Sequence, residues 1–581
     1  MRLAVPHVEK PRRMAGLFSL RTRYAALALL FLIGFAPGPF LLAHAGAALD
    51  LDERITVLAA GALSLAALYS LLWRFPRTIT AVLGACAALA AVELRFIADY
   101  DWPINANTLS LIAETNPAEA GDLASSIPLG LVLGELAIVM LVWLAWPRAD
   151  AHAPARRIDR RALAYSAAGS AGLLALALIS SPATSTLDED SIFPSVPYGQ
   201  MLALRASYPA GFPWVVVDYV RERTALMRAF RHNQNFRFGA SATKSDRPRM
   251  YVLVIGETAR ADRWEINGYP RATTPRLARR DDLVSFKHMM SPWSYSRYAV
   301  PLLISRKPPE MRSAVYKEAS IVTAFKEAGF RTTWISLQAP VGFYESPISI
   351  HAYEADDVRF LNSVDYSKRG KSDLAALPEI RKLLADGSAR DQFVVVHTLG
   401  SHFRYTDRYP PAFARFLPDR PADRPLRLFD PGEREALSNA YDNTILFTDT
   451  FLDEVIRTLE TRPGTDSWMF YSSDHGEALF DDCRQQSGHG QSSRQTHSVA
   501  SVFWASPGYA DRHGAALETL RGRRETLLST AMIFETLADL GGLSVPGQRP
   551  QNSLVAPRLR LPAEVVTAFD DSGGKCPEKS P

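Results

Sequence analysis

Five long apolar runs occupy the first 182 residues, and they restrict the possible folds more than any other feature of the chain. Each run is close to the roughly 20 residues that an α-helix needs to cross a bilayer. Their approximate bounds are 24–44, 55–73, 78–98, 126–146 and 162–181. A buried core helix could explain one such run, but five in succession predict a transmembrane domain with five spans. A cleavable signal peptide is not expected, because the first run is long and is followed by further spans.

Basic residues at the ends of these runs orient the predicted spans. Lysine and arginine precede the first run, and two arginines follow the second. Five more arginines lie between the fourth and fifth runs, namely Arg148, Arg156, Arg157, Arg160 and Arg161. Because basic loops stay in the cytoplasm, these ends are predicted to be cytoplasmic. An odd number of spans then exports everything after about residue 182.

The segment after the fifth run, Ile192–Phe230, is apolar and aromatic with scattered arginines. It is typical of a linker that lies along a membrane surface, although it could also pack against the domain that follows. We therefore divide the chain into three parts. They are a transmembrane domain at 1–182, an interfacial linker at 183–247 and a soluble domain at 248–581.

Charge and cysteine content exclude some classes of protein. The net charge of +4 is small, and no basic block interleaved with aromatic residues predicts a nucleic-acid groove. Three cysteines cannot form a disulfide framework or a four-thiolate zinc site. Cys86 lies in an apolar run, where it is expected to be a small buried hydrophobe. Cys483 and Cys576 could pair in an exported domain, or they could be unrelated thiols.

From about residue 248, short apolar β-type runs alternate with amphipathic helical stretches. The predicted strands are Met250–Ile255, Thr332–Ile335, Gln392–His397, Trp468–Tyr471 and Val499–Trp504. The predicted helices lie near 319–328, 374–386, 433–460 and 525–540. This alternation predicts an α/β fold with a mainly parallel sheet covered by helices. In such sheets, ligands gather at the carboxyl ends of the strands.

Carboxylate and imidazole side chains follow two of the predicted strands. Glu257 comes after the first strand, and Asp474 and His475 come after the fourth. Each residue alone is more often structural than a ligand, but together they form a sensible donor set for a divalent cation. Zinc is favoured over magnesium because a histidine is available as a ligand. A catalytic zinc site is favoured over a structural one because the chain offers no set of cysteine thiolates. The sequence therefore predicts a catalytic Zn²⁺ with an open position for a nucleophile or a substrate.

A serine-rich segment precedes a predicted helix near AVPLLIS. It contains Ser291, Ser294 and Ser296. A hydroxyl beside zinc can lose its proton near neutral pH, and a helix amino terminus can hold a phosphoryl oxygen. One of these serines could therefore attack phosphorus, although an ordinary serine-rich loop would have the same composition.

These residues lie in strings that resemble one family, the phosphoethanolamine transferases of the sulfatase and alkaline-phosphatase superfamily, which include enzymes that modify lipid A and confer polymyxin resistance. The strings are VLVIGETARADRWEINGYPRATTPRL, SYSRYAVPLLIS, HTLGSHFRYTDRYP, AYDNTILFTDTFLDEVI and YSSDHGEALF, with SGHG following. The resemblance covers nearly the whole chain. It implies a five-helix anchor in the bacterial inner membrane, with a cytoplasmic N-terminus and a periplasmic catalytic domain of the alkaline-phosphatase type.

The resemblance assigns roles residue by residue. The family's first zinc carboxylate falls on Glu257, and its Asp-His pair falls on Asp474 and His475. Its nucleophile is usually a threonine five residues before a proline, so counting back from Pro301 gives Ser296. Serine keeps the hydroxyl and loses only a methyl group, so the resemblance implies that Ser296 is both the nucleophile and a zinc ligand.

Further residues match the family's substrate-binding positions. His402 and His489 fall where the family has histidines that contact the transferred group or bind further zinc. Thr115 and Glu119 resemble positions that face the ethanolamine-phosphate head group. Ser294 lies close enough in sequence to compete with Ser296 as the nucleophile.

The chain departs from the lipid A-modifying branch of the family in two places. That branch has several cysteines in this domain, where this chain has only Cys483 and Cys576. Its acidic-Asn-Asn stretch after a tryptophan is replaced here by WISLQAP. Both departures leave the acceptor open, whereas the residues of the donor half-reaction are present.

The resemblance implies transfer of phosphoethanolamine from phosphatidylethanolamine to a lipopolysaccharide acceptor, in lipid A or the core, through a covalent phospho-serine. Ser296 would be the nucleophile, and His402 and His489 would act as acid or base. Two other interpretations stay open. One is a phosphoglycerol transferase or a hydrolase of the same fold, although SYSRYAVP lacks the Cys/Ser-x-Pro-x-Arg signature of a sulfatase. The other is a non-catalytic membrane lipid sensor without metal.

Overall fold

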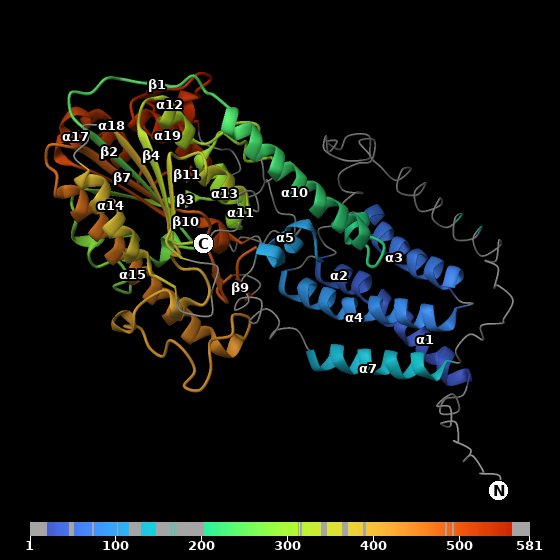
Figure 1. The fold of residues 1–581 in the computed structure, drawn as a ribbon. Helices are drawn as coiled ribbons and strands as arrows, with labels where there is room; N and C mark the ends of the chain where they lie inside the picture. Colours follow the sequence, from blue (N-terminus) through green and yellow to red (C-terminus); the bar gives the residue numbers. More distant parts are fainter. Residues whose placement is uncertain are drawn as a thin grey trace, which may run out of the picture. The chain divides into compact units, whose positions relative to one another are not determined.

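The chain divides into two units in the computed structural model (Figure 1). The first unit comprises Met1–Ser110 and Leu123–Tyr219, and the second comprises Leu111–Asp122 and Val220–Pro581. The structure describes residues 20–45, 51–72, 75–100, 103–114, 129–146, 164, 168, 203–338 except 312, 314 and 315, 346–362, 370–386, 391–482, 485–490 and 493–560.

Apolar helices make up the first unit. They are α1 (Leu20–Phe35), α2 (Pro37–Ala45), α3 (Leu51–Leu72), α4 (Pro76–Tyr100) and α7 (Leu129–Ala145), with α5 (Ala106–Glu114) crossing the boundary between the units. Helix α4 packs against α1, α2, α3 and α7. The start of α4 is also tied to the end of α7, because the indole N–H of Trp146 donates to Thr80 Oγ1 over 3.1 Å.

Three of the five predicted spans are confirmed as helices long and apolar enough to cross a membrane. They are Arg21–His44, Leu51–Leu72 and Pro76–Ala98. The run predicted at 126–146 contains a shorter apolar helix, Val132–Leu144. The fifth predicted span, 162–181, lies outside the described residues apart from 164 and 168. The number of spans therefore stays a prediction.

Helix α10 (Phe212–Asn235) links the two units, since the boundary falls between Tyr219 and Val220. It occupies part of the segment predicted as an interfacial linker. The predicted domain bounds at 183 and 248, and the position of this segment at a membrane surface, stay predictions.

An eight-stranded sheet forms the centre of the second unit, in the order β11-β3-β10-β7-β2-β6-β4-β5. The strands are β2 (Arg249–Gly256), β3 (Leu283–Met290), β4 (Arg331–Ser336), β5 (Asp357–Phe360), β6 (Gln392–His397), β7 (Asp466–Ser473), β10 (Ser498–Ala505) and β11 (Leu527–Ser529). Two short ladders lie outside it, β1 (Ser241–Ala242) with β12 (Leu543–Ser544) and β8 (Ala478–Leu479) with β9 (Ser487–Gly488).

All five predicted strands are present, but the sheet is mixed. Strand β10 runs antiparallel to both of its neighbours, β3 and β7, whereas the remaining pairs are parallel. The helix predicted at 525–540 begins only at Ile533, because Leu527–Ser529 pairs with β3 as β11. Tertiary pairing therefore overrides the helical pattern at the start of that stretch.

Helices cover both faces of the sheet (Figure 1). The helices of this unit that follow β2 are α11 (Ser296–Ile304), α12 (Ile321–Glu327), α13 (Pro347–Ala352), α14 (Ala376–Ala385), α15 (Arg434–Glu460), α16 (Arg494–His497), α17 (Pro507–Arg512), α18 (Gly514–Arg521) and α19 (Ile533–Leu540). Strand β2 shows why two layers are needed, because Leu253 and Ile255 enter the core with α12 and α19, while Val252 and Val254 enter the core with α14 and α15. Each such buried aliphatic side chain contributes about 1.5–3 kcal/mol.

Candidate metal and nucleophile site

The polar residues after β2 and β7 meet because these two strands are parallel neighbours in register. Gly256 at the end of β2 lies opposite Ser473 at the end of β7. The next residues, Glu257 and Asp474, therefore leave the sheet side by side, and the backbone N–H of Asp474 donates to Gly256 O over 3.2 Å. Glu257 and Asp474 are thus neighbours although they lie far apart in the sequence.

Glu257, Asp474 and His475 form a compact buried cluster. Each is at most 2% exposed, and each offers one ligand atom within 4.8 Å of the other two. His475 Nε2 lies 3.4 Å from Glu257 Oε1 and 3.6 Å from Asp474 Oδ2. The structure therefore brings together the three residues that the sequence singles out as metal ligands.

Ser296 places its hydroxyl on this cluster. Ser296 Oγ donates to the Glu257 carboxylate, 3.2 Å from either oxygen, and lies 3.1 Å from His475 Nε2. Ser296 is the first residue of α11, as expected for a group at a helix amino terminus. Among the described contacts, Ser294 makes no hydrogen bond to the cluster, and Ser291 Oγ instead donates to Trp293 O over 2.8 Å. The geometry thus separates the three candidate serines.

Thr258 is a residue at this site that the sequence does not single out. Its φ of 61° is left-handed, which is costly for a β-branched residue. Two hydrogen bonds offset this cost. The N–H of Thr258 donates to Asp474 Oδ1 over 3.1 Å, and its hydroxyl donates to Glu257 Oε1 over 2.7 Å. Thr258 therefore connects the carboxylates at the ends of the two strands.

The donor set fits a cation such as zinc. His475 Nδ1 lies 2.8 Å from the carbonyl of Gly476, to which it can donate, and this leaves Nε2 facing the carboxylates as the nitrogen that would exchange its proton for a metal. Asp474 Oδ2 is buried and has no hydrogen-bond partner among the described residues. An orphaned carboxylate oxygen, a second carboxylate, an imidazole and a hydroxyl are ligands that zinc accepts.

The electrostatics of the cluster also favour a cation. Burial and the charge of Glu257 raise the pKa of Asp474 to about 6. Burial alone would lower the pKa of His475, but the charges of Asp474 and Glu257 raise it to about 10. Burial also opposes ionisation of Glu257, yet the hydrogen bond and charge of His475 hold its pKa well below the usual range. The cluster thus holds two buried carboxylates but only one imidazole that can carry a positive charge. A divalent cation would balance both carboxylates.

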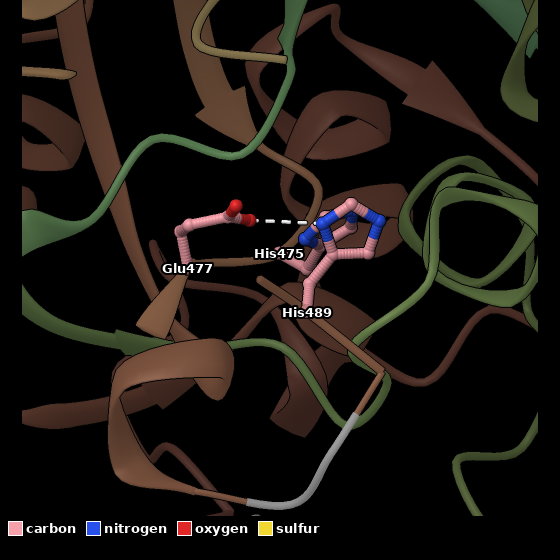
Figure 2. A group of neighbouring side chains, drawn as sticks. All are labelled: His475, Glu477 and His489. Atoms are coloured by element: carbon pink, nitrogen blue, oxygen red, sulfur yellow. Dashed lines mark hydrogen bonds and ion pairs between the residues drawn. The ribbon is translucent and has the colours of Figure 1, made fainter. Parts of the chain in front are cut away.

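A second group of side chains adjoins the cluster, formed by His475, Glu477 and His489 (Figure 2). Glu477 Oε2 lies 2.8 Å from His489 Nδ1, and Tyr405 donates its hydroxyl to Glu477 Oε1 over 2.6 Å. The rings of His475 and His489 are 4.4 Å apart between centroids. Glu477 therefore holds His489 beside the candidate metal ligands, and the ligand atoms of this group are also close enough for a cation.

His402 lies on the same side of the site as His489. The two ring centroids are 6.3 Å apart, and His402 Nδ1 is 2.8 Å from the carbonyl of Phe403. Both histidines therefore lie near the candidate metal ligands, and their roles stay predictions. Thr115, Glu119 and the two soluble-domain cysteines lie outside the described residues.

Two glycines are required by the close packing of these loops. Gly490, after His489, has a φ of +98°, and a Cβ there would lie 2.6 Å from the Tyr295 ring. Gly400, before His402 in the chain, has a φ of +48°, and its Cβ would lie 2.7 Å from Glu257 O. No side chain fits at either position without displacing the loop that carries a site histidine.

Lys307 is a buried amine behind the segment that carries Ser296. Its side chain is 2% exposed, and Nζ has no hydrogen-bond partner in the described part of the chain. Nζ lies 5.4 Å from the ring centroids of Trp293 and Tyr298, which flank Ser296. Cation–π attraction of about 2 kcal/mol offsets only part of the cost of burial. Burial accordingly lowers the pKa of Lys307 to about 7.

Lys307→Met is therefore expected to stabilise the protein in a pH-dependent way. The lysine is protonated in the unfolded chain up to its ordinary pKa of 10.5 but only below about pH 7 in the folded chain. The buried Lys307 therefore destabilises the folded protein fully below pH 7, and this destabilisation disappears as the pH rises toward 10.5. Thermal unfolding in detergent should show a larger gain in Tm at pH 7 than at pH 10, with exposed Lys244→Met as the control. An equal gain in Tm at both pH values would contradict the lowered pKa of Lys307.

Comparisons with known proteins agree with this geometry. The Sulfatase family model matches residues 249–543, just over half of the chain. Phosphoethanolamine transferase EptC of Escherichia coli strain K12 is 25% identical over 525 residues, covering 85% of this chain and 86% of that protein. Kdo(2)-lipid A phosphoethanolamine 7''-transferase of Salmonella typhimurium strain LT2 is 27% identical over 275 residues, covering 46% of this chain and 45% of that protein.

A solved structure extends the likeness to the fold of nearly the whole chain. The integral membrane protein lipooligosaccharide phosphoethanolamine transferase A (EptA) from Neisseria meningitidis matches with a TM-score of 0.67 at 21% identity, covering 92% of this chain and 99% of that one. The resemblance seen in the sequence is thereby confirmed. The chain belongs to the sulfatase family, and its relatives there are phosphoethanolamine transferases.

Proposed function

We propose that this chain is a zinc-dependent transferase that moves phosphoethanolamine from phosphatidylethanolamine to a lipopolysaccharide acceptor. The observation that supports it most is the contact of the Ser296 hydroxyl with both Glu257 and His475. The contact supports Ser296 as the nucleophile, because it brings a hydroxyl onto a carboxylate-imidazole cluster at the end of a sulfatase-family sheet. We further propose that the chain is anchored by five spans in a bacterial inner membrane, with a cytoplasmic N-terminus and a periplasmic site.

Four residues would hold the metal, namely Glu257, Ser296, Asp474 and His475. Zinc bound there would supply Lewis-acid chemistry, making the serine hydroxyl more acidic and neutralising charge that develops on the phosphoryl oxygens. Within the chain itself, Glu257 accepts the hydrogen bond of Ser296 and so directs the hydroxyl lone pairs away from the carboxylate.

The first step is attack of Ser296 Oγ on the phosphorus of phosphatidylethanolamine. A bond forms between Oγ and phosphorus, the bond to the glycerol oxygen breaks, and diacylglycerol leaves with a proton. In the second step an acceptor oxygen attacks the same phosphorus, and the serine oxygen recovers a proton. The amino terminus of α11 would stabilise negative charge on the phosphoryl oxygens, because N–H groups at a helix amino terminus attract anionic oxygens.

His489 is the stronger candidate for moving these protons. With its Nδ1 donating to Glu477, its Nε2 is free to give or take a proton at the leaving or entering oxygen. His402 is the candidate for contact with the transferred group, alongside Thr115 and Glu119 for the ethanolamine head group. These roles follow from the positions of the two histidines beside the cluster and from the family resemblance.

Glu477→Gln is expected to lower turnover by roughly 10- to 100-fold, as for other residues that orient a site histidine. The amide can present its NH₂ toward Nδ1 and so select the wrong tautomer of His489. Tyr405→Phe removes only the other hydrogen bond of Glu477 and is expected to have a smaller effect. Turnover of a fluorescent phosphatidylethanolamine analogue measures both. Equal effects of the two variants would show that Glu477 acts through packing.

The acceptor is tested separately from the donor. The named acceptor of the Salmonella relative is Kdo(2)-lipid A, which favours lipopolysaccharide as the acceptor here. Mass spectrometry of lipopolysaccharide from cells with and without the gene should show one added phosphoethanolamine, and fragmentation assigns it to lipid A or to the core. Donor turnover without any change in lipopolysaccharide would point to another periplasmic glycan or a protein.

A further inference from the structure

The first turn of α11, which carries Ser296, begins with backbone hydrogen bonds from the N–H groups of Tyr298 and Ala299 to the carbonyl of Tyr295, over 3.1 and 2.9 Å. Its N-cap residue, Tyr295, makes no side-chain capping hydrogen bond among the described residues. Pro301 lies inside the helix and cannot donate to the carbonyl of Arg297, four residues earlier. Side-chain contacts made by neighbouring residues therefore add to the support of this turn, which has no side-chain cap.

Arg297, directly after Ser296, makes such a contact. Its side chain is 2% exposed, and its Nε and Nη2 lie 3.2 Å and 2.9 Å from Glu222 Oε1 on α10. A buried arginine needs a carboxylate, and the positive end of a helix is an unfavourable place for a cation. The first turn of α11 contains no acidic residue to offset this charge. Glu222 is thus a carboxylate from another element that stabilises Arg297.

We propose that Glu222 is a positioning residue for the reaction. It holds Arg297, and through it the first turn of α11, so that Ser296 Oγ keeps its contacts of 3.1–3.2 Å with Glu257 and His475. Glu222 itself makes no described contact with the metal cluster. The inference rests on the proposed role of Ser296 as nucleophile.

The size of the effect follows from geometry. Ser296 and Arg297 share a peptide bond, so a backbone shift at Arg297 also moves the Cα that carries the Ser296 side chain. A misplacement of about 1 Å in a reacting group can cost on the order of 100-fold in rate. Binding of the donor would change much less, because neither Glu222 nor Arg297 is proposed to contact it.

Helix α10 also offers a matched control. Asp218, one turn earlier, pairs with Arg205 over 2.6 Å within the first unit. Asp218→Asn removes a carboxylate from the same helix without touching α11. The comparison with Glu222→Gln therefore separates the contact with Arg297 from general weakening of α10.

The experiment uses the full chain in detergent and measures kcat, KM for a fluorescent phosphatidylethanolamine analogue, zinc content and Tm. Glu222→Gln should lower kcat by roughly 10-fold or more while KM and zinc content stay near wild type, and it should also lower Tm, because the buried Arg297 loses its carboxylate. Asp218→Asn should keep wild-type kcat. The double variant Glu222→Gln/Arg297→Gln should lose no more than the worse single variant, since both act through one contact.

Three results would overturn the positioning role. They are a wild-type kcat in Glu222→Gln, an equal loss in Asp218→Asn, and a loss that follows zinc content. If Glu222→Gln does not fold, Arg297→Lys takes its place under the same criteria, because it keeps the charge and loses the two-nitrogen contact. Turnover that persists in Ser296→Ala would instead overturn the proposed nucleophile, whatever Glu222→Gln shows.

Discussion

Ser296→Ala is expected to abolish release of diacylglycerol from phosphatidylethanolamine, whereas Ser294→Ala keeps turnover near wild type. Ser296 Oγ contacts the Glu257 carboxylate and His475, and no described hydrogen bond joins Ser294 to them. Loss of a nucleophile lowers turnover by on the order of 10⁴- to 10⁶-fold. A fluorescent donor assay on the purified full chain measures the difference.

Two further measurements sharpen this test. Intact mass spectrometry after incubation with donor alone should show one phosphoethanolamine on the wild-type chain and none on Ser296→Ala. Ser296→Thr is the conservative control, because it restores the hydroxyl usual in the family and should keep substantial activity. An adduct that persists in Ser296→Ala and disappears in Ser294→Ala would reassign the nucleophile.

Glu257→Ala is expected to remove both bound zinc and turnover. Glu257 supplies a buried carboxylate to the cluster and also accepts the hydrogen bonds of Ser296 and Thr258. Its loss leaves Asp474 and His475 as the remaining protein donors, too few for a site that uses three protein ligands and a nucleophile. Elemental analysis after dialysis gives the zinc content of each purified protein.

The matched control is Glu310→Ala, which removes an exposed carboxylate from the same unit. It should leave zinc content and turnover unchanged. Wild-type protein freed of zinc by a chelator should lose turnover and regain it when zinc is added back. Full zinc content in Glu257→Ala would mean that the metal is held elsewhere, for which His475, Glu477 and His489 are the alternative group.

Strands buried on both faces could be predicted because they are continuous apolar runs. Every residue of β2 and β6 is buried, and both strands are predicted close to their observed bounds. Strand β3 was not predicted, because Lys287 and His288 interrupt its apolar pattern with half-buried positions. Strand β11 has only three residues, too few for a period to show.

The site could be predicted only as far as its residues follow strand ends. Glu257, Asp474 and His475 do, and the parallel pairing of β2 with β7 brings them together. Thr258 and Glu477 follow the same two strand ends, but their contributions act through loop geometry, the first through a left-handed φ and the second through a contact with His489. Such contacts depend on three-dimensional loop paths, which neither composition nor periodicity encodes.

The register of β2 on β7 has a consequence for how such proteins can change. Eight consecutive pairs, from Arg249 opposite Asp466 to Gly256 opposite Ser473, hold the two strands together. A slip of β2 by one residue along β7 would move each β2 side chain to the opposite face of the sheet. Sequence changes that alter this register are therefore expected to destabilise the fold. Loops that carry none of the site residues have no such register constraint. Under the proposed function, acceptor preference could therefore diverge by replacement of such loops while the donor chemistry persists, and exchanging them between relatives would be a practical route to altered acceptor choice.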